Sequence, residues 1–144
     1  MDWSSSIEER IRKRLVAKVY VDSVIDYISR RFNVPRNRVS IAFEPIIAGT
    51  VKPDLVAVYS GTWFIVEFRT RPDPARDLEH VMRCKHVVDS YVKPRNSIPV
   101  LAYVHTAPPS SMVTMAQRFK PLVLLHLIHG TYRVLYESLE TLTV

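Results

Sequence analysis

The sequence predicts an α/β protein in which a mixed central sheet is flanked by helices and the chain ends in a β-hairpin. Three observations predict this class. Apolar residues recur at helical spacing at the start of the chain, short runs rich in β-branched and aromatic residues follow, and a second helical pattern lies between two of those runs. Helices and strands that alternate in this order favour one sheet covered by helices.

The first predicted element is a long helix that ends near Phe32. Ser5 or Ser6, three residues before Glu8 or Glu9, forms a capping-box pattern that opens a helix. Helical spacing then continues through a set of apolar side chains: Ile7, Ile11, Leu15, Val19, Val24, Ile25 and Ile28.

Three strands are predicted next, at residues 39–44, 54–59 and 62–69, separated by Gly49 and by Ser60-Gly61. Asp73-Pro74 then caps a second helix with proline at its first position, and its apolar stripe is Leu78, Val81, Met82, Val88 and Val92. A buried strand at 98–104, a short helix at 110–120 and a hairpin of 122–128 and 132–137 complete the order α-β-β-β-α-β-α-β-β.

Length and composition limit the class of protein. The chain has 144 residues, which predicts a single domain spanning 1–144. Cys84 is the only cysteine, which excludes an intramolecular disulfide and a zinc cluster built from several cysteines. The longest nearly apolar run, 122–128, falls well short of the roughly 20 residues that span a bilayer. The start of the chain lacks the features of a signal peptide, so we expect a soluble, intracellular, cytoplasmic protein without a membrane partner.

The charge favours a polyanionic partner. The formal net charge is +6, and 14 of the 20 basic residues are arginine, whose planar fork suits phosphate. Nucleic acid is therefore an expected partner, although an ordinary basic protein has the same composition. One glutamine and three asparagines indicate a heat-adapted host. Three glycines cannot build a phosphate-binding loop or a dinucleotide fingerprint, and neither an HExxH nor a GxSxG motif occurs.

Two acids are predicted to face each other on the central hairpin. If Ser60-Gly61 forms a two-residue turn, the numbers of opposed residues sum to 121, and Asp54 lies opposite Glu67. Opposed side chains are about 5 Å apart, so the two negative charges repel unless a cation compensates. Mg²⁺, which prefers oxygen ligands, is one such cation.

Other charged residues are predicted near this pair. The same register places Lys52 opposite Arg69, and a turn at Gly49 brings Glu44 opposite Asp54. Lys85 lies on the apolar stripe of the second helix. It either extends its stem along apolar surface or turns its ammonium group toward the acids.

These residues resemble a known family. Pro53-Asp54, followed 13 residues later by Glu67-Phe68-Arg69, within an α-β-β-β-α-β order, is similar to the PD-(D/E)XK nuclease superfamily, whose restriction-endonuclease-like fold includes archaeal Holliday junction resolvases. The resemblance covers roughly residues 5–105. It implies that Asp54, Glu67 and the carbonyl of Phe68 bind Mg²⁺ or Mn²⁺, with Glu44 a further candidate ligand. Arg69 stands where the family has lysine.

Three functions are compatible with this pattern. The first is a metal-dependent DNA endonuclease, in which Asp54 and Glu67 hold the ion and Arg69, helped by Lys52 or Lys85, stabilises the charge that develops on phosphate. The second is a catalytically degenerate protein of the same fold that binds nucleic acid or serves in assembly, because a guanidinium is a poor proton acceptor. The third is a homodimeric scaffold built on the apolar hairpin 122–136. A homodimer fits all three.

Overall fold

The computed structural model describes the backbone of residues 3–139 and the side chains of residues 7–139. Its elements follow the predicted order. The helices are α1 (Trp3–Phe32), a 3₁₀ turn (Arg36–Arg38), α2 (Pro74–Val87), a π-helical turn (Val88–Val92) and α3 (Ser111–Ala116). The strands are β1 (Ser40–Phe43), β2 (Leu55–Tyr59), β3 (Thr62–Arg69), β4 (Asn96–Val104), β5 (Leu122–Ile128) and β6 (Thr131–Ser138).

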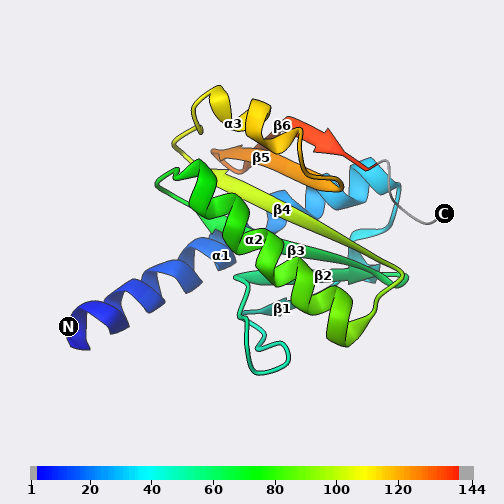
Figure 1. Cartoon of the computed structure of the whole chain (residues 1–144), viewed down its shortest axis with the longest axis horizontal. Coiled ribbons are helices and arrows are strands. Elements are labelled where there is room, and N and C mark those ends of the chain that lie inside the picture. The colour runs from blue at the N-terminus through cyan, green and yellow to red at the C-terminus, as the bar shows by residue number, and fades with distance from the viewer. Residues whose placement is uncertain (1–2, 140–144) are drawn as a thin grey trace.

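The six strands form one mixed sheet in the order β1-β2-β3-β4-β5-β6 (Figure 1). The first three strands are antiparallel, β3, β4 and β5 run parallel, and β5 and β6 form the C-terminal hairpin. Tyr59 pairs with Thr62 and Leu55 with Val66, which confirms the predicted register of the central hairpin. Ser60 and Gly61 both have positive φ, as a type I′ turn requires.

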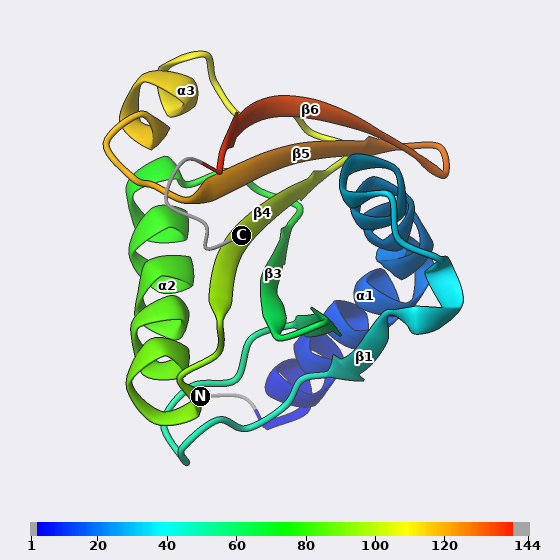
Figure 2. The same ribbon diagram turned by 90° about the vertical axis from the view of Figure 1, so that its right-hand side faces the viewer.

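The sheet has helices on both faces, with α1 on one side and α2 on the other (Figure 2). Alternation along β3 sends Phe64, Val66 and Phe68 into the core beneath α1. Ile65 packs instead with α2 residues such as Cys84. Glu67 has the same parity as Ile65, so its side chain also lies beneath α2.

The first half of α1 differs from the sequence prediction. The helix includes Trp3, so Ser5 and Ser6 lie within it and do not open it as a capping box. Ile11, Leu15 and Val19 are 56%, 56% and 67% exposed, because this half runs out beyond the strands (Figure 1). The core contact of α1 comes from its second half.

Two boundaries are set by the backbone at the ends of elements. The second helix continues as a π-helical turn to Val92 and stops at Lys93, which has left-handed backbone geometry. The first strand is shorter than predicted and ends at Phe43, because Glu44 has a positive φ. Across the described residues 3–139, none of the helices has the length and apolar character of a membrane span.

Candidate active site

Asp54 and Glu67 come together as predicted, at the end of the central hairpin where β2 begins and β3 approaches its last residue. Glu67 is 1% exposed and Asp54 is 8% exposed. The backbone N–H of Phe68 donates a hydrogen bond of 2.9 Å to Asp54 Oδ2. This bond turns the Asp54 side chain toward β3, so that two buried carboxylates share one small volume.

Arg69 supplies the positive charge at this point. Its Nη1 lies 3.2 Å from Glu67 Oε2 and 3.7 Å from Asp54 Oδ2. The same nitrogen donates a 3.1 Å hydrogen bond to the carbonyl oxygen of Phe68. The three oxygens that the family resemblance assigns to a metal ion therefore all surround one guanidinium nitrogen.

Asp77, in the first turn of α2, fixes Arg69 from the other side. Asp77 Oδ1 accepts a 3.0 Å bond from Arg69 Nε. Its Oδ2 accepts bonds from the backbone N–H of Asp73 at 3.0 Å and from the hydroxyl of Tyr103 at 2.9 Å. Asp77 is 3% exposed, so both of its oxygens are used inside the protein. Arg69 is thus held at both ends of its guanidinium.

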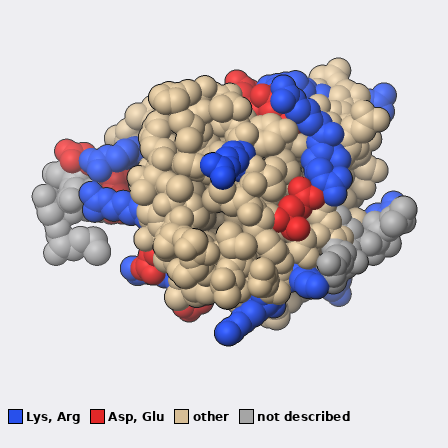
Figure 3. All heavy atoms as spheres, turned by 90° about the horizontal axis from the view of Figure 1, so that it is seen from above, with Lys and Arg blue, Asp and Glu red and all other residues tan. Residues whose placement is uncertain are grey.

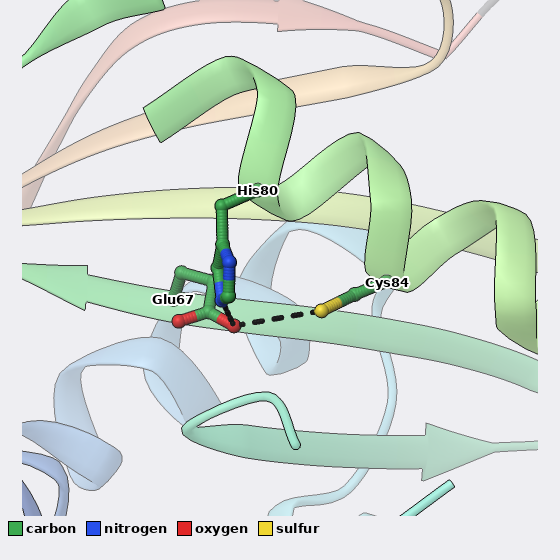
Figure 4. Close-up of side chains that lie close together, drawn as sticks. All are labelled: Glu67, His80 and Cys84. Carbon is green, nitrogen blue, oxygen red and sulfur yellow. Dashed lines mark hydrogen bonds and ion pairs between the residues drawn. The ribbon is translucent and has the colours of Figure 1, made fainter. Parts of the chain in front are cut away.

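Two further α2 side chains contact the other oxygen of Glu67. His80 Nε2 lies 3.1 Å from Glu67 Oε1, and the thiol of Cys84 donates to the same oxygen at 3.7 Å. Figure 4 shows His80 and Cys84 descending from one face of α2 toward Glu67. The two oxygens of Glu67 therefore have different partners: Oε2 faces Arg69, and Oε1 faces His80 and Cys84.

The two facing acids differ in their affinity for protons. Burial, together with the charge of Glu67 and a hydrogen bond to it, raises the pKa of Asp54 from 3.8 to about 7. Burial also acts to raise the pKa of Glu67, but the bond from His80 and the charge of Arg69 outweigh it and lower that pKa. Below about pH 7 the pair therefore carries its negative charge on Glu67 and a proton on Asp54.

The same burial acts on the neighbouring groups. Burial of Arg69 acts to lower its pKa, but the charges of Glu67, Asp54 and Asp77 outweigh this effect and raise it. Burial, followed by the charge of Glu67, raises the pKa of Cys84 to about 12. Arg69 is therefore a permanent cation, and the free Cys84 side chain is a thiol at neutral pH.

Lys85 lies away from the acids. Its Nζ donates to Asp89 Oδ2 at 2.8 Å, to Ser97 Oγ at 2.6 Å and to the carbonyl of Ser97 at 3.2 Å. In the β3–β4 register Leu101, not Ser97, is opposite Glu67. Ser97 is four residues before Leu101, a distance of about 13 Å along the strand. Lys85 therefore joins α2 to the start of β4. Neither of the two predicted roles of Lys85 describes this contact.

Lys52 and Glu44 belong to the loop before β2. The β2–β3 ladder ends at Leu55, and residues 47–51 form a separate tight turn. Lys52 is therefore exposed, and the predicted pairing of Lys52 with Arg69 does not form. Glu44 does meet Asp54 as the predicted turn requires, through a 3.0 Å bond from its backbone N–H to the Asp54 carbonyl. That bond joins the two backbones and leaves the Asp54 carboxylate directed at β3.

Sequence reasoning missed Asp77, His80 and Cys84. A usable signal was present, because the three lie three and four residues apart and so share one face of a helix. The same face carries the buried Leu78 and Val81, which directs it toward the sheet. What the spacing could not show is that this face lies over Glu67.

Comparisons with known proteins support the fold of this chain and do not assign it a function. No family model matches the chain, and no curated protein matches it. A solved structure described as the SPO1766 protein of unknown function from Silicibacter pomeroyi is similar, with a TM-score of 0.52, 10% identity, and coverage of 86% of this chain and 73% of that one. Another, SfsA of Pyrococcus furiosus in complex with Ca²⁺, has a TM-score of 0.38 and 12% identity. This match covers 78% of this chain and 60% of SfsA. At these identities the first likeness supports the α/β architecture alone.

Proposed function

We propose that this chain is a nucleic-acid-binding protein of nuclease-like architecture in which Arg69 takes the place of the catalytic metal ion. One observation carries the proposal: Arg69 Nη1 lies among Glu67 Oε2, Asp54 Oδ2 and the Phe68 carbonyl at 3.2, 3.7 and 3.1 Å. The acid pair needs a shared cation, and the guanidinium provides one from within the chain.

The oxygen set does not fit Mg²⁺ while Arg69 is held there. Mg²⁺ requires oxygen ligands at about 2.1 Å in octahedral geometry and retains several waters. The point where the three oxygens converge is occupied by a nitrogen whose group is bonded on its far side to Asp77. No hydrolytic step is therefore assigned to this oxygen set.

The exposed half of α1 is the proposed contact with phosphate. Arg10, Arg12, Lys13, Arg14 and Lys18 are all exposed, and no acidic residue lies between positions 10 and 18. In Figure 3, Lys and Arg side chains lie at the end of the molecule from which α1 projects, next to Asp and Glu side chains, and others are spread over the rest of this face. A projecting row of cations binds phosphates without reading base sequence.

Salt-dependent binding tests this contact. We expect fluorescence anisotropy with duplex DNA to show affinity that falls steeply with salt concentration. The triple variant Arg12→Glu, Lys13→Glu and Arg14→Glu is expected to weaken binding and to flatten the salt dependence by about 0.9 logarithmic units for each phosphate that the variant no longer neutralises. The matched control, Arg38→Glu, Arg76→Glu and Arg133→Glu, makes the same charge change at exposed positions on other elements. Equal weakening in both variants would reject α1 as the contact.

A metal-dependent DNA endonuclease is the second candidate. The observation that favours it is that three possible ligand oxygens lie within 3.7 Å of Arg69 Nη1. Around the single guanidinium there are also three carboxylates, those of Asp54, Glu67 and Asp77. If Arg69 swings away, Asp54, Glu67 and the Phe68 carbonyl would hold the ion, and its chemistry would be to activate a water and to neutralise phosphate.

One assay separates the two candidates. Supercoiled, single-stranded and junction DNA are incubated with the protein and Mg²⁺, Mn²⁺ or EDTA. We expect binding without cleavage from the natural chain. Arg69→Lys, which places the family's lysine at this position, is the variant that tests for a gain of DNA cleavage. Cleavage by the natural chain that requires metal and is lost in Asp54→Ala would select the endonuclease instead.

A further inference from the structure

Three donor atoms of different chemistry meet beside the acid pair, on the side away from Arg69. They are the carboxylate of Glu67, the imidazole of His80 and the thiol of Cys84, and their ligand atoms all lie within 4.8 Å of one another. In Figure 4 the two α2 side chains approach the same oxygen of Glu67.

The fold brings these three residues together for simple reasons. His80 and Cys84 are four residues apart on α2, so their side chains lie one turn apart on the same face. Glu67 has the strand parity that directs it beneath that helix. Leu78 and Val81 are buried on the same side of α2 and hold it against the sheet.

The spacing of the donors fits a tetrahedral ion. Zinc ligands lie at about 2.0–2.3 Å, so two ligands of one tetrahedral ion are about 3.3–3.8 Å apart. Glu67 Oε1 is 3.1 Å from His80 Nε2 and 3.7 Å from Cys84 Sγ. Changes of a few tenths of an ångström are needed at these two contacts, and the His80 and Cys84 donors, which lie within 4.8 Å of each other, must come to about 3.5 Å to share an ion.

The chemistry of the donors selects the ion. A mixture of oxygen, nitrogen and sulfur ligands suits Zn²⁺ and is poor for Mg²⁺, which takes oxygen. Glu67 and Cys84 are buried, whereas the His80 side chain is 39% exposed. The His80 edge is therefore the side from which an ion would enter and at which a water would complete the fourth position.

We propose that Glu67, His80 and Cys84 form a zinc site that links α2 to β3. The ion binds Oε1 of Glu67 while Oε2 keeps its contact with Arg69. His80 binds as the neutral imidazole through Nε2, and the thiol of Cys84 releases its proton to solvent as the Zn–S bond forms. This proposal does not depend on nucleic-acid binding.

Cobalt substitution gives a direct readout. Chelator-treated protein is titrated with Co²⁺ in the absence of DNA. We expect one equivalent to produce visible bands typical of tetrahedral cobalt and a sulfur-to-cobalt charge-transfer band in the near ultraviolet. Zn²⁺ should displace the cobalt and raise the melting temperature, and Mg²⁺ should do neither.

The control variant changes the same residue type on the same helix as one of the test variants. Cys84→Ser is expected to abolish the charge-transfer band, and His80→Ala to weaken Zn²⁺ binding at least about tenfold. His86→Ala, at an exposed position of the same helix, is expected to leave both unchanged. His80→Ala keeps the test decisive if Cys84→Ser misfolds, because His80 is partly exposed and its loss leaves the core intact.

Failure has a distinct form. A natural chain that shows no sulfur-to-cobalt band, or Zn²⁺ binding that is equal in the natural chain and His80→Ala, would overturn the zinc site. Neither result bears on the salt-dependent DNA binding proposed above, which depends on α1 and not on this site.

Discussion

Arg69 is the residue on which the charge balance of the site depends. Three buried carboxylates, those of Asp54, Glu67 and Asp77, lie within 3.7 Å of its guanidinium nitrogens. A guanidinium, with five donors in a planar fork, can serve carboxylates on several elements at once. Arginine at this position therefore balances the charge of all three carboxylates.

Removing the guanidinium should destabilise the fold. For Arg69→Met we expect a loss of about 2–5 kcal/mol in the free energy of unfolding, because buried carboxylates lose their cation. Urea denaturation measures the loss. Arg118→Met, at an exposed position on the chain after α3, is the control and should change stability by less than about 0.5 kcal/mol. Equal effects from the two would show that Arg69 does not balance the acids.

Asp54 makes stability depend on pH with a definite sign. Its pKa is about 7 in the fold, above its ordinary value of 3.8. The folded protein therefore holds a proton that the unfolded chain releases, so this stabilisation is complete below about pH 4 and is lost as pH rises through about 7. The lowered pKa of Glu67 acts with the opposite sign and only in more acid solution.

Asp54→Asn isolates this contribution. Between pH 5.5 and 8 we expect the natural chain to lose about 1–2 kcal/mol more stability than the variant, because asparagine cannot release a proton. Denaturation at the two pH values, with EDTA present, measures the difference. Parallel pH profiles for the two proteins would contradict a raised Asp54 pKa.

At the scale of elements, α1 has two halves with different roles. The second half packs Val24, Tyr27 and Ile28 into the core at 0–1% exposure. The first half projects beyond the strands with its apolar and basic side chains exposed. The same helical pattern of apolar residues is thus buried in the core in the second half of α1 and exposed to solvent in the first half.

Matched truncations distinguish the halves. Ile28→Ala is expected to cost about 2–5 kcal/mol, since it leaves a cavity in the core. Leu15→Ala, at a side chain 56% exposed, is expected to cost less than about 1 kcal/mol. Chemical denaturation of both variants is the measurement. A large effect at Leu15 would mean that this half is packed in solution.

At the scale of the whole molecule, burial is concentrated in the parallel centre of the sheet. All residues of β4 except Asn96 are buried, and all of β5 except Ile128. The outer strand β1 has no buried residue, and β6 has one. Helices cover the central strands from both sides, as Figure 2 shows.

Hydrogen exchange should follow this gradient. We expect the amides of β4 to exchange only through global unfolding and those of β1 to exchange through local opening, because an edge strand is held by a neighbour on one side alone. Native-state exchange read by mass spectrometry distinguishes peptides from the two strands. Slow exchange of β1 comparable to that of β4 would require a partner covering the edge.

Much of this architecture follows from local pattern. The turn at Ser60-Gly61 sets the hairpin register, since only residues tolerant of positive φ close a two-residue loop, and this register placed Asp54 beside Glu67. The strands 62–69 and 122–128 have the limits that their β-branched and apolar runs indicate. The proline at the start of α2 likewise marks its first residue.

The partners of the charged side chains were decided by the tertiary structure. Lys85 was expected either along apolar surface or near the acids and instead binds Ser97, and His80 and Cys84 reach Glu67 only because α2 crosses β3 at that point. A sequence determines spacing along a helix or strand, which local hydrogen bonds fix. The angle and height at which a helix crosses a sheet depend on the packing of many side chains, and they select which charges meet.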